Sequence, residues 1–186
     1  MHHFQVKMRM LRHDYLSRQM LKGLSSYKYK ASGHTWLDDL HDPMWNWIVK
    51  NMFPLWLAPN LVTLTGMAAI LIAHDLLIMY APELDGANAP AWVHLLAFLA
   101  MIFYVNMDCM DGKQARRTNT SSPLGQLFDH GCDALVTGLI ITNVATSVHL
   151  QISAQMVLMM FAPLALWILG QWEEYHTGAL PCSVLV

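Results

Sequence analysis

Charged side chains are scarce in this sequence. Asp, Glu, Lys and Arg account for 13% of its 186 residues, whereas 55% of the residues are hydrophobic. A soluble domain usually carries about a quarter charged residues, so the composition excludes an ordinary soluble protein of this length. We therefore expect a membrane protein, with lipid around it and no nucleic-acid partner.

Cysteine is also scarce. Cys109, Cys132 and Cys182 lack the spacing of metal ligands and are odd in number, so we expect neither a disulfide framework nor a zinc site. A cleavable signal peptide is not expected either, because residues 1–30 are polar and basic without a continuous apolar run. The first membrane span should therefore act as the insertion signal.

Four apolar stretches are long enough to cross a membrane. They cover residues 61–80, 91–107, 124–148 and 152–170. A hydrocarbon core of ~30 Å requires a helix of about 20 residues. We therefore predict an all-α membrane protein with about four transmembrane helices.

The basic residues are unevenly distributed along the chain. Eight of the eleven Lys and Arg residues precede residue 51, and the other three are Lys113, Arg116 and Arg117. Cytoplasmic loops carry the Lys and Arg excess of membrane proteins. We therefore place the N-terminus and the basic segment 113–117 in the cytoplasm, and the loops 81–90 and 149–155 on the opposite side.

The segment before the first span has the composition of an interfacial amphipathic helix. Asp42 and Pro43 suit an N-cap and a first helical position. The following segment carries side chains typical of the membrane interface, namely Trp45, Trp47, Lys50 and Trp56. A tryptophan belt that only anchors the first span is an equally weighted alternative. The predicted organisation is a basic cytoplasmic N-terminus with this helix over residues 1–56, and a transmembrane domain over residues 57–186.

Two pairs of aspartates give the strongest functional signal. Asp108 and Asp111 are three residues apart, and Asp129 and Asp133 are four apart, so each pair projects from one face of a helix. Ser122 can cap the second of these helices, with Pro123 at its first position. If the two helices pack antiparallel across the short basic loop, all four carboxylates converge.

Converging acids inside a membrane need positive partners. Each acid costs at least ~2.5 kcal/mol on insertion scales, and four together repel strongly in a low dielectric. Two divalent cations would balance them and leave coordination positions for phosphate oxygens. Small residues near the acids would let a diphosphate approach the backbone, and one arginine supplies a planar cation for phosphate. These residues are Gly112, Ala115, Gly125 and Arg116.

The pattern D-x2-D-G-x2-A-R-x8-G-x3-D-x3-D, from Asp108 to Asp133, resembles the signature of the CDP-alcohol phosphotransferases. The stretches DGKQARRTNTSSPLG and LFDHGCDAL are similar to the eukaryotic choline/ethanolamine phosphotransferases. LAPNLVTLTG before the first span and WEEYHTG after the fourth resemble flanking motifs of the same branch. The resemblance covers most of residues 28–180.

The resemblance implies transfer of phosphocholine or phosphoethanolamine from CDP-choline or CDP-ethanolamine to diacylglycerol, giving a phospholipid and CMP. Asp108, Asp111, Asp129 and Asp133 would hold Mg²⁺ or Mn²⁺, as two ions. Asn60, Gly112, Ala115, Arg116 and Gly125 would bind the CDP-alcohol.

The resemblance also makes His130 the general base, with Asp133 as the rival. A group with a near-neutral pKa is well suited to take a proton from an alcohol. The family usually has Glu where this chain has Gln126, one helical turn before His130. The implied location is the endoplasmic reticulum or Golgi membrane, with the site facing the cytoplasm and a homodimer as the assembly. Because family members are longer, we expect this chain to be incomplete at its C-terminus.

Alternatives to this interpretation remain open. The four acids could form structural ion pairs, or the pathway of a cation or proton transporter. The chain could also be an inactive fragment of the enzyme. His74 and Asp75 form an ionisable pair of open role within the first span. Glu173, Glu174 and His176 could either line the site or form a solvated helix end.

Overall fold

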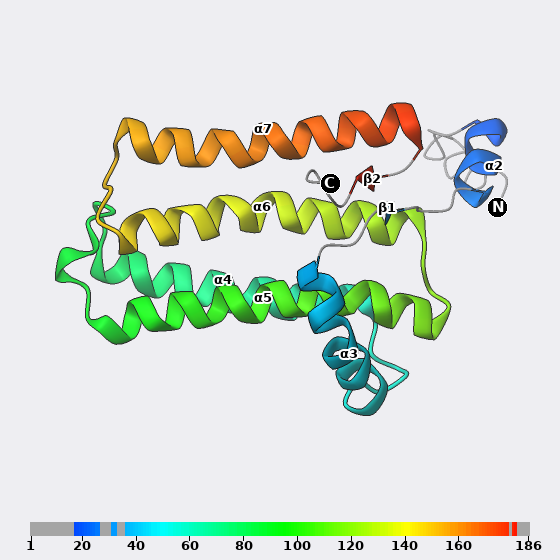
Figure 1. The fold of residues 1–186 in the computed structure, drawn as a ribbon, viewed down its shortest axis with the longest axis horizontal. Coiled ribbons are helices and arrows are strands. Elements are labelled where there is room, and N and C mark those ends of the chain that lie inside the picture. The colour runs from blue at the N-terminus through cyan, green and yellow to red at the C-terminus, as the bar shows by residue number, and fades with distance from the viewer. Residues whose placement is uncertain (1–16, 27–30, 33–35, 179, 182–186) are drawn as a thin grey trace, which may run out of the picture.

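The computed structural model describes residues 17–26, 31–32, 36–178 and 180–181. Four long helices run antiparallel along its longest axis (Figure 1): α4 (Pro59–Tyr80), α5 (Ala91–Thr118), α6 (Pro123–Ser147) and α7 (Ala154–Thr177). The strands β1 (Ala31–Ser32) and β2 (Leu180–Pro181) form a two-residue parallel pair. The described residues also form the helices α2 (Arg18–Ser26) and α3 (Trp36–Asn51) and the 3₁₀ turn η1 (Gly86–Asn88). The prediction of an all-α protein is confirmed.

Helix caps recognisable in the sequence set several helix ends. Ser122 caps α6, its hydroxyl accepting a hydrogen bond from the Gly125 amide at 3.1 Å, and Pro123 takes the first position, as predicted. Pro59 opens α4 in the same way. At the far end of α7, Gly178 closes the helix in the left-handed conformation at φ 72°, which glycine adopts without steric cost.

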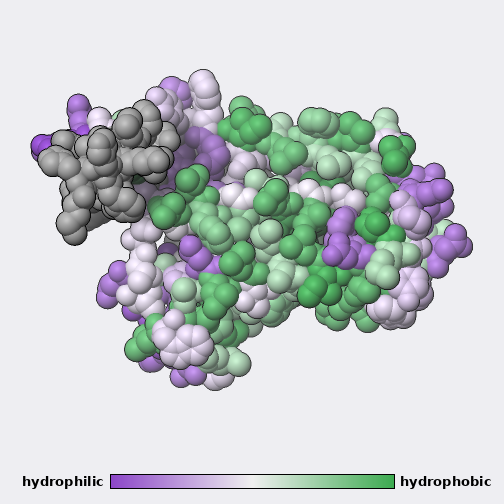
Figure 2. Space-filling view, turned by 180° about the vertical axis from the view of Figure 1, so that it is seen from behind, coloured by the Kyte–Doolittle hydropathy of each residue, from purple (hydrophilic) through white to green (hydrophobic). Residues whose placement is uncertain are grey.

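Three of the four long helices are long and apolar enough to cross a membrane, namely α4, α5 and α7. The remaining one, α6, has 25 residues but carries Asp129, His130 and Asp133 in its first half. The structure thus supports an integral membrane protein, and the exact count of four spans stays a prediction. Figure 2 shows hydrophobic side chains over the middle of one face and hydrophilic ones toward its ends.

The helix α5 is longer than its apolar run. The segment predicted as a basic loop is helical as far as Thr118, and the chain turns at Asn119, whose φ is 55°. Twenty-eight residues of α-helix measure about 42 Å, which exceeds a hydrocarbon core of ~30 Å. The excess lies at the basic C-terminal end of α5. There, polar side chains of α5 form hydrogen bonds and an ion pair with α3 and the segment that follows it.

Small residues allow α4 and α5 to pack closely. A Cβ atom added at Gly66 would lie 3.1 Å from both Met107 Cβ and Tyr104 Cδ2. The core between α4, α5 and α6 contains Ile70, Ala73, Ala100, Tyr104 and Val136. Close backbone approach at small residues is the usual way membrane helices associate, since lipid supplies no hydrophobic driving force between them. By contrast, α7 buries only Met156.

The predicted start of the interfacial helix was wrong. The helix α3 runs Trp36–Asn51, so Asp42 is not its N-cap and Pro43 lies inside it. The first turn instead holds Asp38 and Asp39, whose negative charge suits the positive end of the helix dipole. Because proline lacks an amide proton, the helix tolerates Pro43 only by giving up one backbone hydrogen bond. Trp45 and Val49 of α3 pack against Met110 of α5.

Candidate active site

The four aspartates lie at two levels near one end of the bundle. This end, called the basic end, contains the C-terminus of α5 and the N-terminus of α6, with Lys113, Arg116 and Arg117. From the helix rise of 1.5 Å, Asp108 and Asp133 lie roughly 15 Å inside it, and Asp111 and Asp129 roughly 10 Å. Asp108 therefore lies at the same depth as Asp133, and Asp111 at nearly the same depth as Asp129, so the pair on α5 faces the pair on α6 as the spacing predicted. The four carboxylates thus lie together in one part of the bundle and are not spread along its length.

Three of these aspartates form a group that can bind a metal ion. Asp108, Asp111 and Asp129 each offer a carboxylate oxygen, and these atoms lie within 4.8 Å of one another. Asp111 is buried at 5% exposure, while Asp108 and Asp129 are half-buried. Carboxylate oxygens are the ligands that hard divalent cations prefer.

The surroundings of this group fit a cation. Asp129 Oδ1 is a buried oxygen with no hydrogen-bond partner in the described part of the chain. Neither ion pair found there, Lys113 with Asp42 or His149 with Asp85, involves an aspartate of the group. A buried carboxylate oxygen without a donor or a charged partner is costly. Among the described residues, no Lys or Arg forms an ion pair with these aspartates, which disfavours the structural ion-pair alternative, and a bound cation would supply positive charge.

Two hydroxyl groups that the sequence interpretation missed donate hydrogen bonds to aspartates of the signature. The Thr63 hydroxyl of α4 donates a short hydrogen bond to Asp111 Oδ2, and both residues are buried. The Tyr104 hydroxyl of α5 donates to Asp133 Oδ1 at 2.6 Å. Thr63 lies in the motif LAPNLVTLTG, and Tyr104 lies one helical turn before Asp108, so position alone gave a weak signal for both.

A pocket of about 700 Å³ opens beside Asp111 and Asp129. Its walls come from the segment before α4, the last turns of α5 and the first turns of α6. All five residues predicted to bind the CDP-alcohol line it: Asn60, Gly112, Ala115, Arg116 and Gly125. His130 lines it as well, whereas Asp108 and Asp133 are not among its lining residues. The pocket and the three-aspartate group thus share Asp111 and Asp129.

His130 lies between the pocket and α7. Its ring meets the Trp167 ring edge to face, with centroids 5.4 Å apart. One turn earlier, Gln126 Nε2 donates a hydrogen bond to Glu174 Oε1 at 3.2 Å. Of the polar residues at the end of α7, Glu174 therefore contacts α6, while Glu173 and His176 are exposed.

The ionisable pair within the first span separates into two environments. His74 Nδ1 lies 2.8 Å from Asn143 Oδ1 of α6, so this histidine joins two helices. Asp75 is exposed on the surface of α4. Neither residue belongs to the pocket or to the acidic group.

Sequence comparison decides the family. The protein-family model described as CDP-alcohol phosphatidyltransferase matches residues 56–184. The chain belongs to this family. Cholinephosphotransferase 1 of Xenopus laevis is 36% identical over 173 residues, which are 91% of this chain and 42% of that protein. The same-named protein of Rattus norvegicus is 37% identical over 166 residues, 89% of this chain and 41% of the relative. The CDP-alcohol phosphatidyltransferase class-I family protein 3 of Dictyostelium discoideum is 42% identical over 168 residues, with shares of 89% and 41%.

The family match covers the helices that build the site. Residues 56–184 of this CDP-alcohol phosphatidyltransferase contain α4 to α7 and every pocket-lining residue except Leu55. The helix α3 lies outside the match. The chain spans about two fifths of the length of the curated relatives it matches.

Proposed function

We propose that the chain transfers phosphocholine or phosphoethanolamine from its CDP-alcohol to diacylglycerol, forming phosphatidylcholine or phosphatidylethanolamine and releasing CMP. The observation that carries this proposal is the contact between a pocket of about 700 Å³ and a group of three aspartates at one end of apolar helices. A polar nucleotide can enter such a pocket from water, while a lipid hydroxyl reaches it from the membrane. The printed names of the relatives from Xenopus and rat support choline as one of the alcohols.

The pocket lining supports the proposed binding of the CDP-alcohol. Arg116 is exposed there and can donate paired hydrogen bonds to a phosphate. A Cβ atom at Gly125 would lie 3.3 Å from Ser122 Oγ and 3.9 Å from Asn60 Oδ1, so its absence keeps this part of the wall open. Gly112 and Ala115 line the α5 side of the pocket, and their small size leaves room for the ligand next to the helix backbone.

The proposed cofactor is Mg²⁺ or Mn²⁺, as two ions. Asp108, Asp111 and Asp129 would hold them, with Asp133 as the fourth ligand through the oxygen that Tyr104 does not contact. Divalent cations, when bound, would offset the negative charge of the diphosphate and of the departing CMP. The chain's own part is to keep the carboxylates oriented through Thr63 and Tyr104.

The proposed reaction is a displacement at the phosphorus that carries the choline or ethanolamine. The diacylglycerol oxygen forms a new bond to this phosphorus, the bond from phosphorus to the CMP oxygen breaks, and CMP leaves with the electron pair. His130 takes the hydroxyl proton, because it lines the pocket beside Asp129. Asp133 is less suited as the base, since Oδ1 already accepts the Tyr104 hydrogen bond and the residue lies outside the lining.

The remaining proposals concern organisation and place. We propose a cytoplasmic N-terminal part over residues 1–56 and the catalytic part over residues 57–186, with the basic end facing the cytoplasm. The positions of Lys113, Arg116 and Arg117 at one end of the bundle support this orientation. The membrane would be that of the endoplasmic reticulum or Golgi. Diacylglycerol in that membrane would be the acceptor. The assembly would be a homodimer.

The deciding experiment measures transfer from radiolabelled CDP-choline and CDP-ethanolamine in membranes that express this chain, with and without Mg²⁺ or Mn²⁺. We expect labelled phospholipid only when a divalent ion is present. Asp111→Asn should abolish transfer, because it removes one charge from the proposed site. Asp75→Asn is the matched control, since Asp75 is an exposed acid outside the site. Transfer that persists with a chelator, or in Asp111→Asn, would contradict the proposal.

A further inference from the structure

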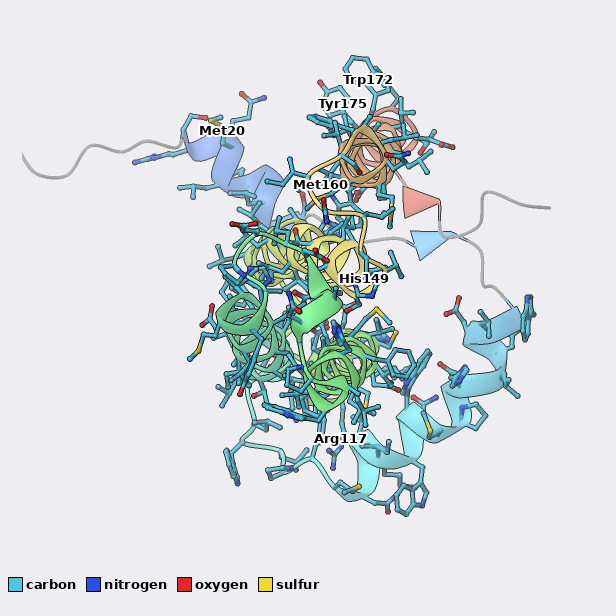
Figure 3. The ribbon with its side chains drawn as sticks, turned by 90° about the vertical axis from the view of Figure 1, so that its left-hand side faces the viewer. Met20, Arg117, His149, Met160, Trp172 and Tyr175 are labelled. Carbon is cyan, nitrogen blue, oxygen red and sulfur yellow. The ribbon has the colours of Figure 1, made fainter. Side chains whose placement is uncertain are left out.

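The basic end of α5 has two polar faces. Successive residues of an α-helix point about 100° apart, so Arg116 and Arg117 cannot face the same neighbour. Arg116 is exposed and lines the pocket, whereas Arg117 is half-buried and absent from the lining. Figure 3 shows Arg117 on the side of α5 that faces α3. The two adjacent arginines of the signature segment therefore have different surroundings.

Arg117 caps the C-terminal end of α3. Its Nη1 donates hydrogen bonds to Val49 O at 2.5 Å and to Phe53 O at 2.7 Å, and its Nη2 donates to Lys50 O at 3.1 Å. Val49 and Lys50 lie in the last turn of α3, where helix carbonyls lack partners within the helix. A cation at this end is also favoured by the helix dipole. These contacts use both terminal nitrogens of the guanidinium group.

Gln114 extends the same set of contacts toward α4. Its side chain is fully buried, and Nε2 donates to Pro54 O at 3.0 Å and to Leu57 O at 3.1 Å. Its Oε1 lies 3.4 Å from Arg117 Nη1. Arg117 and Gln114 thus hold five carbonyl groups between residues 49 and 57, along the whole connection from α3 to α4.

This connection forms one wall of the pocket. Leu55, Trp56, Leu57 and Ala58 line it, followed by Pro59 and Asn60 at the start of α4. We propose that Arg117 is a positioning residue for the pocket, acting through the carbonyls of α3 and of the connection to fix this wall and Asn60. The inference rests on the proposed function for its ligand, a CDP-alcohol. It separates Arg117 from the phosphate-binding role proposed for Arg116.

The middle of α3 has anchors of its own. Trp45 Nε1 donates to Asn106 Oδ1 at 2.8 Å, and Lys113 forms an ion pair with Asp42. Removing the Arg117 side chain should therefore release the end of α3 and the connection without detaching the whole helix. The pocket wall would move while the acidic group on α5 and α6 stays in place.

The test compares the 186-residue chain in lipid nanodiscs with its Arg117→Ala, Arg117→Lys and Arg116→Ala variants. Hydrogen exchange reports the amides of residues 52–58, and calorimetry reports CDP-choline binding in the presence of Mg²⁺. In Arg117→Ala we expect exchange of these amides to rise ~10-fold or more, and CDP-choline affinity to fall by a similar factor, because several hydrogen bonds to one charged group are lost. The turnover number at saturating CDP-choline should change much less than the apparent KM.

The other two variants separate positioning from direct binding. Arg117→Lys should recover part of both losses, since one ammonium group can donate to one or two of the carbonyls but lacks the planar fork. Arg116→Ala should weaken CDP-choline binding and leave the exchange of residues 52–58 unchanged. If Arg117→Ala weakens binding with unchanged exchange, or raises exchange with unchanged binding, the inference is overturned. Transfer by the unsubstituted chain tests the proposed function separately, because exchange and binding are measured without turnover.

Discussion

The hydroxyl of Tyr104 donates a hydrogen bond to Asp133 Oδ1 at 2.6 Å, joining α5 to the fourth aspartate of the signature on α6. Tyr104 itself is buried at 5% exposure and packs against Gly66 of α4. Asp133 is thereby oriented from outside the group formed by Asp108, Asp111 and Asp129. One oxygen of Asp133 is engaged by the tyrosine, so any role toward a metal ion falls to the other oxygen.

We expect Tyr104→Phe to lower the affinity for Mn²⁺ by ~10-fold or more, since outer hydrogen bonds hold ligating carboxylates in place. Paramagnetic resonance of Mn²⁺ added to the purified chain measures this without turnover. Tyr80→Phe is the matched control, because Tyr80 is exposed, lies outside the acidic group and meets the Trp92 ring edge to face. Wild-type Mn²⁺ affinity in Tyr104→Phe would show that the hydroxyl does not orient a ligand.

A second hydroxyl gives a parallel prediction on α4. Thr63→Val keeps the shape of the side chain but leaves buried Asp111 Oδ2 without its donor. We expect Mn²⁺ affinity to fall ~10-fold or more, with helix content unchanged in circular dichroism. Thr65→Val is the control, since Thr65 is exposed and its hydroxyl donates to the Leu61 carbonyl of its own helix at 2.7 Å. Equal losses in both variants would contradict a specific role for Thr63.

The sequence predicted what depends on spacing along a helix. The facing aspartate pairs and the Ser122 cap follow from residue intervals and local capping rules. The positions of Asn60 and Arg116 at the pocket were instead implied by the family resemblance. The convergence needed one further assumption, that the two helices pack antiparallel, and the structure has this arrangement.

Contacts between elements distant in sequence could not be predicted in this way. Arg117 was grouped with Arg116 as a loop residue, because the apolar stretch predicted to cross the membrane ends at residue 107. Hydropathy also gives no information about α3 as a packing partner of this segment. The start of α3 was missed for a related reason. Proline usually marks the first turn of a helix, but tertiary packing of Trp45 and Val49 against Met110 stabilises a helix around Pro43.

The orientation of the bundle gives a third prediction. In a chain whose three cysteines are replaced by serine, Glu173→Cys should react with an impermeant maleimide from the cytoplasmic side, and Asn88→Cys from the other side. Both positions are exposed, and they lie at opposite ends of the helices. Sealed vesicles of known orientation provide the measurement. Labelling of Glu173→Cys from the lumen would contradict the proposed cytoplasmic site.

The last prediction separates the two candidate bases. If His130 takes the proton, His130→Ala should lower the turnover number by ~100-fold or more, the usual scale of general base catalysis. CDP-choline and Mn²⁺ affinity should change little, because the neighbouring aspartates keep their positions. Asp133→Asn should instead lower Mn²⁺ affinity, since Asp133 is proposed as a ligand.

His149→Ala controls for removal of a histidine, as His149 lies in the connection from α6 to α7 at the opposite end of the bundle, near Asp85. Its turnover should stay within about twofold of the unsubstituted chain. The decisive comparison is therefore turnover against Mn²⁺ affinity across the three variants. Near-normal turnover in His130→Ala, together with unchanged Mn²⁺ affinity and a large loss of turnover in Asp133→Asn, would move the base from the histidine to the aspartate that Tyr104 holds.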